Sequence, residues 1–346
     1  MKNTPDSYNE QNPSTPFWDN ADQISKILYR LHSHSTLFLK AIRKNASLKR
    51  LLITRFPFRF KDSVYPPSLH IEFTDACNLK CVYCNNPHFS SPRKMMSDAT
   101  FDNLIKHLSA SKIDRICIGG GEPTLHPKFP EFVYRLASVS KIVTIVTNGH
   151  WQSSEITKAM LDSPIDFIEV SVESGSKSDF ESTRIGSDFD LVIRNLLELK
   201  RLKRELKSKS HINLRLMVRP SQKGKIETDS RKFWKHYADT LMPQYVLQLD
   251  EFDAMPDVFL SKQMANNLFP KCGLPFRNIQ VRSNGDVPIC QISGSSLIRE
   301  KKVIAGNVND TPLIDIWRGE LFKQYRLGHR TGNHDITPIC KGCKGC

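Results

Sequence analysis

Short apolar, β-branched runs alternate with amphipathic segments between residues 69 and 249. The segments 190–207 and 225–241 carry apolar residues at helical spacing, which predicts amphipathic helices. This alternation predicts an α/β fold, a partial parallel (β/α)6 barrel of the TIM type. In such barrels the functional loops follow the carboxyl ends of the strands. The predicted strands cover residues 69–73, 115–118, 142–146, 167–173, 211–218 and 244–249.

Residues that carry chemistry follow the first four predicted strands. Cys77, Cys81 and Cys84 stand after the first strand in the spacing Cys-x3-Cys-x2-Cys. Because the carboxyl ends of parallel strands meet at one face of a barrel, we expect all these residues to converge there. The others are Gly119, Gly120, Gly121, Glu122 and Pro123 after the second strand, Thr147 and Asn148 after the third, and Ser171 and Glu173 at the end of the fourth.

The cysteine loop offers one ligand fewer than a closed metal site. Three thiolates from one loop can bind three irons of a 4Fe-4S cluster and leave the fourth iron open, whereas structural zinc takes four protein ligands. A zinc knuckle completed by His88 is the alternative. The glycine run allows close approach of the backbone to a ligand, but it can also be a plain strand-to-helix turn.

These motifs together resemble the radical S-adenosylmethionine (SAM) superfamily. The resemblance rests on the cysteine spacing, on Tyr83 before the third cysteine, and on the Gly-Gly-Glu-Pro element. It implies that Cys77, Cys81 and Cys84 hold a 4Fe-4S cluster whose open iron is chelated by SAM. A solvated position for Arg184 stays open. The implied cofactor-binding residues are Tyr83, Gly119, Gly120, Gly121, Glu122, Pro123, Thr147, Asn148, Ser171, Glu173 and Arg184.

A second cysteine group lies in the last quarter of the chain. Asn284 and Gly285 stand between two β-rich runs, 276–281 and 287–292, which predicts a β-hairpin. A helix is predicted from residue 312 to about residue 325. Cys117, inside an apolar strand, is predicted to be a core residue and not a ligand. The cysteines of the second group are Cys272, Cys290, Cys340, Cys343 and Cys346.

The segments around this second group resemble the auxiliary-cluster extensions called SPASM and twitch domains, including Gly-Asn-Val at 306–308 and Ile-Trp-Arg-Gly at 316–319. Because the sequence stops at Cys346, the resemblance implies the twitch pattern, with one 4Fe-4S cluster closed by four cysteines and suited to electron transfer. Cys346 stays open as a substitute ligand, since the tail also resembles a ferredoxin run. The implied ligands are Cys272, Cys290, Cys340 and Cys343.

The composition predicts the cellular compartment and the domain organisation. With 346 residues and 39% hydrophobic content, the chain can bury one large core and a smaller unit. We expect a basic, partly flexible helical extension at 1–65, the barrel at 66–255 and the auxiliary-cluster domain at 256–346. No apolar run is long enough to span a bilayer and no secretion signal is evident, so nine cysteines predict metal ligation in the cytoplasm.

Positive charge is concentrated near the amino terminus. The segment 24–61 has ten Lys or Arg residues and no Asp or Glu, against a net charge of +14 for the whole chain. The segment is interpreted as helices with a solvated basic face, or as a contact with an acidic partner or an anionic membrane surface. Lys200, Lys203, Arg204 and Lys207 recur at helical spacing and predict a solvated helix face.

The resemblance implies an enzyme that reductively cleaves SAM to a 5'-deoxyadenosyl radical, which abstracts a hydrogen atom from substrate. Dehydrogenation of a carbohydrate or aminocyclitol-like small molecule is the first expectation, with the auxiliary cluster as electron conduit and flavodoxin or ferredoxin as electron donor. Modification of a peptide or protein side chain is the alternative. A zinc-stabilised binding protein without catalytic activity is the third hypothesis.

Overall fold

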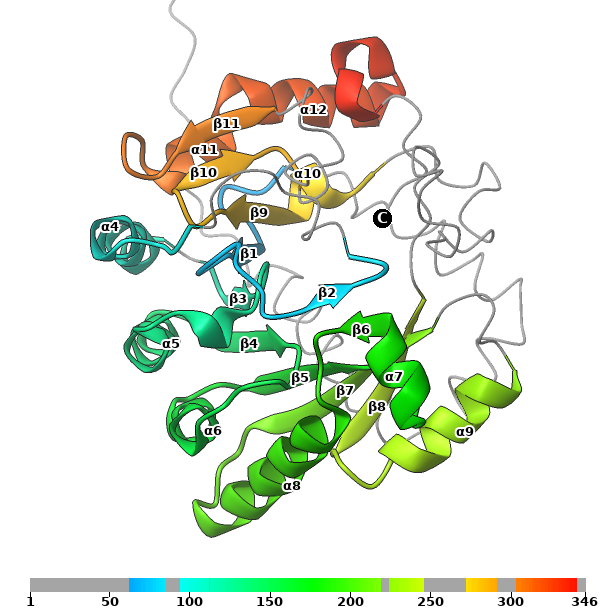
Figure 1. Ribbon diagram of the computed structural model, residues 1–346. Coiled ribbons are helices and arrows are strands. Elements are labelled where there is room, and N and C mark those ends of the chain that lie inside the picture. The colour runs from blue at the N-terminus through cyan, green and yellow to red at the C-terminus, as the bar shows by residue number, and fades with distance from the viewer. Residues whose placement is uncertain are drawn as a thin grey trace, which may run out of the picture. The chain divides into compact units, whose positions relative to one another are not determined.

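The computed structural model describes residues 62–84, 94–111, 113–218, 224–245, 272–290 and 303–340 (Figure 1). All of them belong to one compact unit, Phe58–Cys346. The expectations about the basic segment 24–61, and about His88, Cys343 and Cys346, concern residues outside these ranges. They stay predictions, as do the domain boundaries.

A parallel sheet of seven strands forms the centre of the described structure, in the order β8-β7-β5-β4-β3-β1-β9. Every neighbouring pair is parallel. The predicted α/β fold with six barrel strands is confirmed, and β9 adds a seventh strand from the C-terminal region. The sixth strand, predicted at 244–249, begins earlier, at Thr240, and residues 246–249 lie outside the described ranges. The strands are β1 (Ser68–Ile71), β3 (Arg115–Ile118), β4 (Ile142–Thr147), β5 (Phe167–Val172), β7 (His211–Val218), β8 (Thr240–Tyr245) and β9 (Asn278–Val281).

Helices cover the outer face of this sheet (Figure 1). Alternate strand residues such as Leu69, Ile116 and Val143 are buried in one core with the apolar faces of these helices. None of the described helices is long and apolar enough to cross a bilayer. The helices are α4 (Asp98–Ser109), η3 (Pro123–Leu125), α5 (Phe129–Ser138), α6 (Ser154–Asp162), α7 (Lys177–Thr183), α8 (Phe189–Glu205) and α9 (Lys225–Trp234).

The predicted helix 225–241 is divided between α9 and the start of β8. The helix ends at Trp234, whose buried indole donates from Nε1 to the Glu173 carbonyl at 2.8 Å. The Asp239 amide then donates to the Ile212 carbonyl at 2.9 Å, so the chain has already joined the sheet. Tertiary anchoring by Trp234 therefore overrides the longer helical pattern of the sequence.

The C-terminal region pairs differently from the predicted hairpin. The turn at 282–285 is present, with the Gly285 amide donating to the Arg282 carbonyl at 2.9 Å. However, β9 pairs with β1, while β10 (Asp286–Pro288) pairs with β11 (Ile304–Asn307). The predicted helix also breaks at Gly319 into two helices. The helices of this region are α10 (Leu274–Arg277), α11 (Leu313–Arg318), α12 (Glu320–Thr331), η8 (His334–Ile336) and η9 (Pro338–Cys340).

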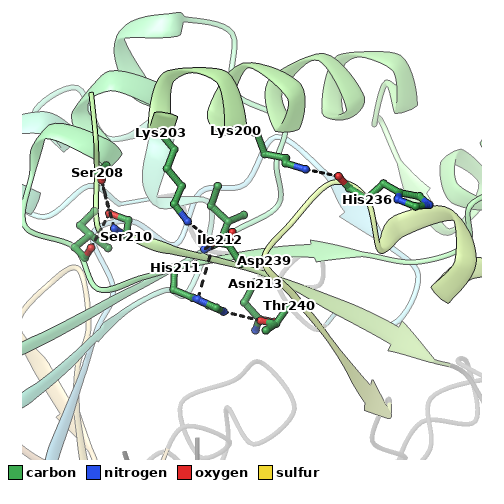
Figure 2. Close-up of polar contacts among 11 residues, drawn as sticks. Lys200, Lys203, Ser208, Ser210, His211, Ile212, Asn213, His236, Asp239 and Thr240 are labelled. Atoms are coloured by element: carbon green, nitrogen blue, oxygen red, sulfur yellow. Dashed lines mark hydrogen bonds and ion pairs between the residues drawn. The ribbon is translucent and has the colours of Figure 1, made fainter. Parts of the chain in front are cut away.

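A polar network joins α8 to the start of β7 and β8 (Figure 2). Lys203, only 22% exposed, pairs with Asp239, and Lys200 donates to the His236 carbonyl. Asp239 also accepts from the Ile212 amide at 2.8 Å. The prediction that these two lysines belong to a purely solvated face is therefore wrong, because both fasten α8 to the connection that precedes β8.

Candidate active site and auxiliary cluster site

The cysteine loop is held by pairing with the segment after α7. Within the loop, β2 (Lys80–Cys81) forms an antiparallel ladder with β6 (Arg184–Ile185), beside each other in Figure 1. The Val82 amide donates to the Thr183 carbonyl at 3.0 Å, and the Cys84 amide donates to the Cys81 carbonyl at 3.0 Å. Backbone hydrogen bonds therefore fix the part of the loop that carries the second and third cysteines.

The first cysteine contacts the loop that follows β4. The Cys77 sulfur accepts from the Leu79 amide at 3.5 Å and from Asn148 Nδ2 at 3.7 Å. Asn148 Nδ2 also donates to Asn78 Oδ1 at 2.7 Å. Donors of this kind around a sulfur stabilise a thiolate that binds metal. Burial raises the pKa of the Cys77 thiol, so a bound cation is needed to hold it as thiolate at neutral pH.

The glycine loop packs directly on the backbone of the cysteine loop. The Gly121 amide donates to the Thr74 carbonyl at 3.0 Å, and the Glu122 amide donates to the Ala76 carbonyl at 2.7 Å. A Cβ atom on Gly121 would lie 2.1 Å from the Ala76 carbonyl oxygen. Gly120 has a φ of +113°, and a Cβ there would lie 2.5 Å from Glu72 Cγ. The small residues are thus required where two loops meet.

Glu122 joins the glycine loop to the end of β4. Its Oε1 accepts from both the amide and the hydroxyl of Thr124, at 3.2 and 2.7 Å, and from Thr147 Oγ1 at 2.8 Å. Its Oε2 accepts from the Asn148 amide at 2.7 Å. Pro123 begins the short helix that Glu122 caps. The carboxylate of Glu122 is therefore occupied by protein donors and holds the glycine loop against the end of β4.

Arg184 is the buried centre of a charged network beside Cys81. Its Nε lies 3.3 Å from Glu173 Oε2, and both side chains are at most 3% exposed. Glu173 Oε1 accepts from the Tyr83 hydroxyl, and the Ser171 carbonyl accepts from Arg184 Nη1. Burial raises the pKa of Cys81, and Arg184 opposes that shift. The alternative of a solvated Arg184 is therefore wrong, and β5, α7 and the cysteine loop are joined at this point.

The sequence-predicted cofactor residues are thus assembled at one end of the sheet. Tyr83, Glu122, Thr147, Asn148 and Glu173 belong to hydrogen-bonded networks with the cysteine loop or with one another. Within the described ranges, no three His, Cys, Asp or Glu side chains are grouped to hold a single metal ion. The three thiols of the cysteine loop, with the N–H donors to Cys77, fit the ligand set of a 4Fe-4S cluster.

Three of the four predicted auxiliary ligands gather around α12. The Cys272 amide donates to His329 Nδ1 at 3.2 Å, and the Cys340 sulfur lies 3.4 Å from His329 Nε2. Burial raises the pKa of Tyr325 on α12 to about 12, and the thiols of Cys340 and Cys290 add to that rise. The Cys272 sulfur accepts from the Leu274 amide at 3.4 Å. The three thiols come from separate segments and have N–H donors beside them, so they fit a cluster that would link these segments.

The inner face of the sheet is polar. Arg215 forms an ion pair with Glu169 and donates to Gln244 Oε1 at 3.2 Å. Burial, assisted by Arg215, lowers the pKa of His70 to about 4. Burial raises the pKa of Cys117 to about 11. Three strands, β5, β4 and β3, separate Arg215 on β7 from His70 on β1, and the charge of Arg215 still contributes to the lowered pKa of His70.

Sequence reasoning missed Asn78, the polar residues of β7, and two residues of α12. Asn78 carries no metal-ligating group, yet it links the cysteine loop to Asn148 and to the His150 carbonyl. Polar residues at alternate positions of β7 were a usable signal for the inner face. His329 and Tyr325 lie on α12 outside any motif, so their sequence spacing alone gave no signal.

Two family models match the chain in separate segments. One, described as the radical SAM superfamily, matches residues 71–214. The other, SPASM, described as an iron-sulfur cluster-binding domain, matches residues 272–344. Domains of these two kinds imply SAM and 4Fe-4S clusters as cofactors.

Curated relatives and solved structures agree with this assignment. GTP 3',8-cyclase of Psychromonas ingrahamii is 30% identical over 135 residues, 38% of each chain. A cofactor-modifying protein for tungsten-containing aldehyde ferredoxin oxidoreductase, from Pyrococcus furiosus, is 24% identical and covers 80% of this chain and 86% of its own. The chain spans about two fifths of the length of the first cyclases it matches, 38% and 42%.

The fold is shared with two solved structures that contain SAM. BtrN in complex with AdoMet and 2-DOIA has a TM-score of 0.51 at 18% identity and covers 81% of this chain and 93% of its own. Streptococcus suis SuiB bound to SAM has a TM-score of 0.58 at 13% identity and covers 93% of this chain and 74% of its own. The chain is a member of the radical SAM superfamily with a C-terminal SPASM-type iron-sulfur domain.

Proposed function

We propose that the chain removes a hydrogen atom from a polar small molecule that binds the inner face of the sheet. Among the described residues, three side chains on this face have a buried polar atom with no hydrogen-bond partner, namely His70 Nδ1, Asn213 Nδ2 and Gln280 Oε1. Buried polar groups are nearly always paired, and an unpaired one costs about 1–3 kcal/mol. A ligand with several hydroxyl or amine groups would supply the missing partners.

Register places these three groups on one face. His70 on β1 is directly beside Gln280 on β9. His70 is also in register, through β3, β4 and β5, with His211 on β7, and Asn213 lies two residues further along the same strand. Since alternate residues of a strand share a face, all three point to the same side of the sheet.

The charges of this face suit a polar neutral or zwitterionic substrate. His70, with a pKa of about 4, is neutral at pH 7 and can donate or accept a hydrogen bond. The charges of Glu169 and Arg215 compensate each other, and the pair presents one hydrogen-bond acceptor and one donor group to a ligand. When bound, SAM and the two clusters would supply the 5'-deoxyadenosyl radical and accept the electron that an oxidised substrate loses. The chain orients the target carbon and excludes water from it.

Dehydrogenation of a carbohydrate or aminocyclitol-like molecule is the preferred reaction. The name GTP 3',8-cyclase identifies a nucleotide as the substrate of those relatives, and the BtrN structure holds 2-DOIA. The alternative is a peptide substrate, since SuiB has also been solved with the precursor peptide SuiA. The polar inner face is the observation that favours a small molecule, because its unpaired groups on β1, β7 and β9 share one side of the sheet.

The cofactor content provides the first test. Protein purified without oxygen should bind about eight irons, and changing Cys77, Cys81 and Cys84 together to Ala should leave about four and abolish SAM cleavage. Stoichiometric zinc in colourless protein would contradict the proposal. Cys346→Ser should keep both clusters, whereas Cys272→Ser should lose the second, if the four-cysteine ligand set is right.

The substrate class provides the second test. Deuterated aminocyclitols, sugars, nucleotides and peptides would be compared for transfer of deuterium into 5'-deoxyadenosine. We expect transfer from a small polar molecule, and Arg215→Met should raise its KM. The matched control is Arg201→Met, because Arg201 pairs with Glu205 on the outer surface of α8 at 2.7 Å. Transfer from peptides alone, with KM unaffected by Arg215→Met, would favour the peptide alternative.

A further inference from the structure

We propose that His329 donates a hydrogen bond from Nε2 to the thiolate of Cys340 and thereby raises the reduction potential of the auxiliary cluster. The inference rests on the proposed role of Cys340 as a cluster ligand. His329 is 2% exposed and lies in the last turn of α12. Nothing in the sequence motifs assigned it a role, yet its ring is inserted between two predicted ligands.

The two ring nitrogens of His329 have different partners. Nδ1 lies 3.2 Å from the backbone nitrogen of Cys272, and Nε2 lies 3.4 Å from the sulfur of Cys340. A backbone N–H group can only donate a hydrogen bond, so Nδ1 must accept and carries no proton. The neutral ring then has its proton on Nε2. The hydrogen bond from Cys272 therefore directs the Nε2–H group at the sulfur of Cys340.

The proton on Nε2 makes His329 a hydrogen-bond donor and not a metal ligand. A protonated Nε2 has no lone pair in the ring plane with which to bind iron, so His329 does not replace a cysteine. Its contact instead resembles the outer hydrogen bonds that adjust the electron density of metal ligands. Cys272 takes part through its backbone N–H group, while its sulfur accepts a hydrogen bond from the Leu274 amide at 3.4 Å.

The surroundings of the ring keep this geometry fixed. Tyr325, one helical turn before His329, is 1% exposed, and the thiols of Cys340 and Cys290 contribute to raising its pKa. The Cys340 amide donates to the Thr337 carbonyl at 2.9 Å, which fixes the short helix that carries the cysteine. Because α12, η9 and the segment before α10 are all packed here, His329 cannot rotate away without opening a buried region.

An N–H···S hydrogen bond withdraws electron density from a thiolate and stabilises the more negative, reduced cluster. Removing it should make reduction less favourable. We expect the equilibrium constant for reduction to fall about tenfold, which is about 59 mV for a one-electron couple. A higher potential suits a cluster that accepts an electron from substrate, so His329 would support the oxidative reaction proposed above.

The test uses the full-length chain with Cys77, Cys81 and Cys84 changed to Ala, so that the auxiliary cluster is the only spectroscopic signal. Redox titration followed by electron paramagnetic resonance would compare His329 with His329→Leu and His329→Gln. We expect His329→Leu to keep about four irons and lower the potential by about 59 mV. His329→Gln should restore part of the shift, because its amide can also donate to sulfur and accept from a backbone amide.

A second measurement needs no substitution at His329. Pulsed electron-nuclear double resonance of the reduced cluster, compared in H2O and D2O, should show an exchangeable proton coupled to the cluster. His329→Leu should lose that coupling. An unchanged potential with full iron, or no exchangeable coupling in the parent chain, would overturn the proposal. Loss of iron in both variants would also overturn it and identify His329 as a ligand. Absence of iron from the parent chain would instead refute the auxiliary site itself.

Discussion

Replacing Gly121 by alanine would place a methyl group inside the backbone of the cysteine loop. The added Cβ would lie 2.1 Å from the Ala76 carbonyl oxygen and 2.7 Å from the Thr74 carbonyl oxygen. Real Cβ contacts essentially never fall below 3.0 Å, so the two loops must separate by about 1 Å. Backbone atoms cannot rotate out of the way as a side chain can. The displacement therefore falls on the loop that carries Cys77, Cys81 and Cys84.

The expected effect is larger on activity than on stability. Overpacking of this kind costs about 1–3 kcal/mol, and Tm should fall by about 2–12 °C. A displacement of 1 Å at a reacting centre can cost about a hundredfold in rate, so we expect a loss of that size in SAM cleavage. The hydrogen bonds from Gly121 to Thr74 and from Glu122 to Ala76, at 3.0 and 2.7 Å, would lengthen together.

Gly224→Ala is the matched control. Gly224 has a φ of +91°, and no described residue lies within 4 Å of an added Cβ, so alanine there introduces backbone strain without a clash against the described structure. With a ψ of −117° Gly224 also lies outside the left-handed helical region, and such strain costs about 1–3 kcal/mol, comparable with the clash at Gly121. Iron content, production of 5'-deoxyadenosine and Tm would be measured for both variants. If Gly121→Ala kept full iron and full cleavage while Gly224→Ala behaved the same, the close packing of the two loops would have no functional role.

Three further single substitutions and one double variant test the hydrogen-bond and ion-pair networks around Glu122, Arg184 and Asp239. Glu122→Gln should destabilise the chain by about 1–3 kcal/mol in chemical denaturation, because one amide cannot satisfy donors at both oxygens, and unchanged stability would refute this. Arg184→Met should cost about 3–5 kcal/mol by leaving Glu173 buried without its partner, and adding Glu173→Gln should recover part of it. Burial alone would raise the pKa of Asp239, but the hydrogen bonds from Lys203 and the Ile212 amide outweigh burial, so the net pKa is below 3.8. The Asp239 carboxylate therefore stabilises the folded chain above pH 3.8, and this stabilisation is lost as the pH falls below that value. Asp239→Asn should lower Tm at pH 7 and flatten its decline under acid conditions, and an unchanged acid profile would contradict the assignment.

Periodicity and motif order were enough to predict the barrel and the place of the site. The runs at 115–118 and 211–218 became β3 and β7 with the same bounds. The motifs after four strands meet at one end because parallel strands share a direction, a consequence that needs no side-chain detail. The roles of individual residues were less accessible. Glu122 was interpreted as a cofactor residue, but its four bonds to Thr124, Thr147 and Asn148 depend on a fold that brings two loops together.

The failures share a physical origin in contacts between distant segments. The run before Asn284 was expected to pair across its own turn, yet β9 forms hydrogen bonds with β1. The residues of a turn predict that the chain reverses there, but they do not predict which strand each flanking segment pairs with, because strand pairing depends on packing against distant segments. His329 was missed for the same reason, since its partners Cys272 and Cys340 approach it only in three dimensions.

The pairing of β9 with β1 has a consequence for synthesis of the chain. Ser68 in β1 and Asn278 in β9 are hydrogen-bonded although they are 210 residues apart in sequence. At about 5–20 residues per second, the ribosome would need about 10–40 s to make the chain between them. During that interval β1 has an unpaired edge, of the kind that recruits other chains. Slow translation or truncation before residue 278 should therefore promote aggregation, and a chaperone that covers the β1 edge should increase the yield of folded protein.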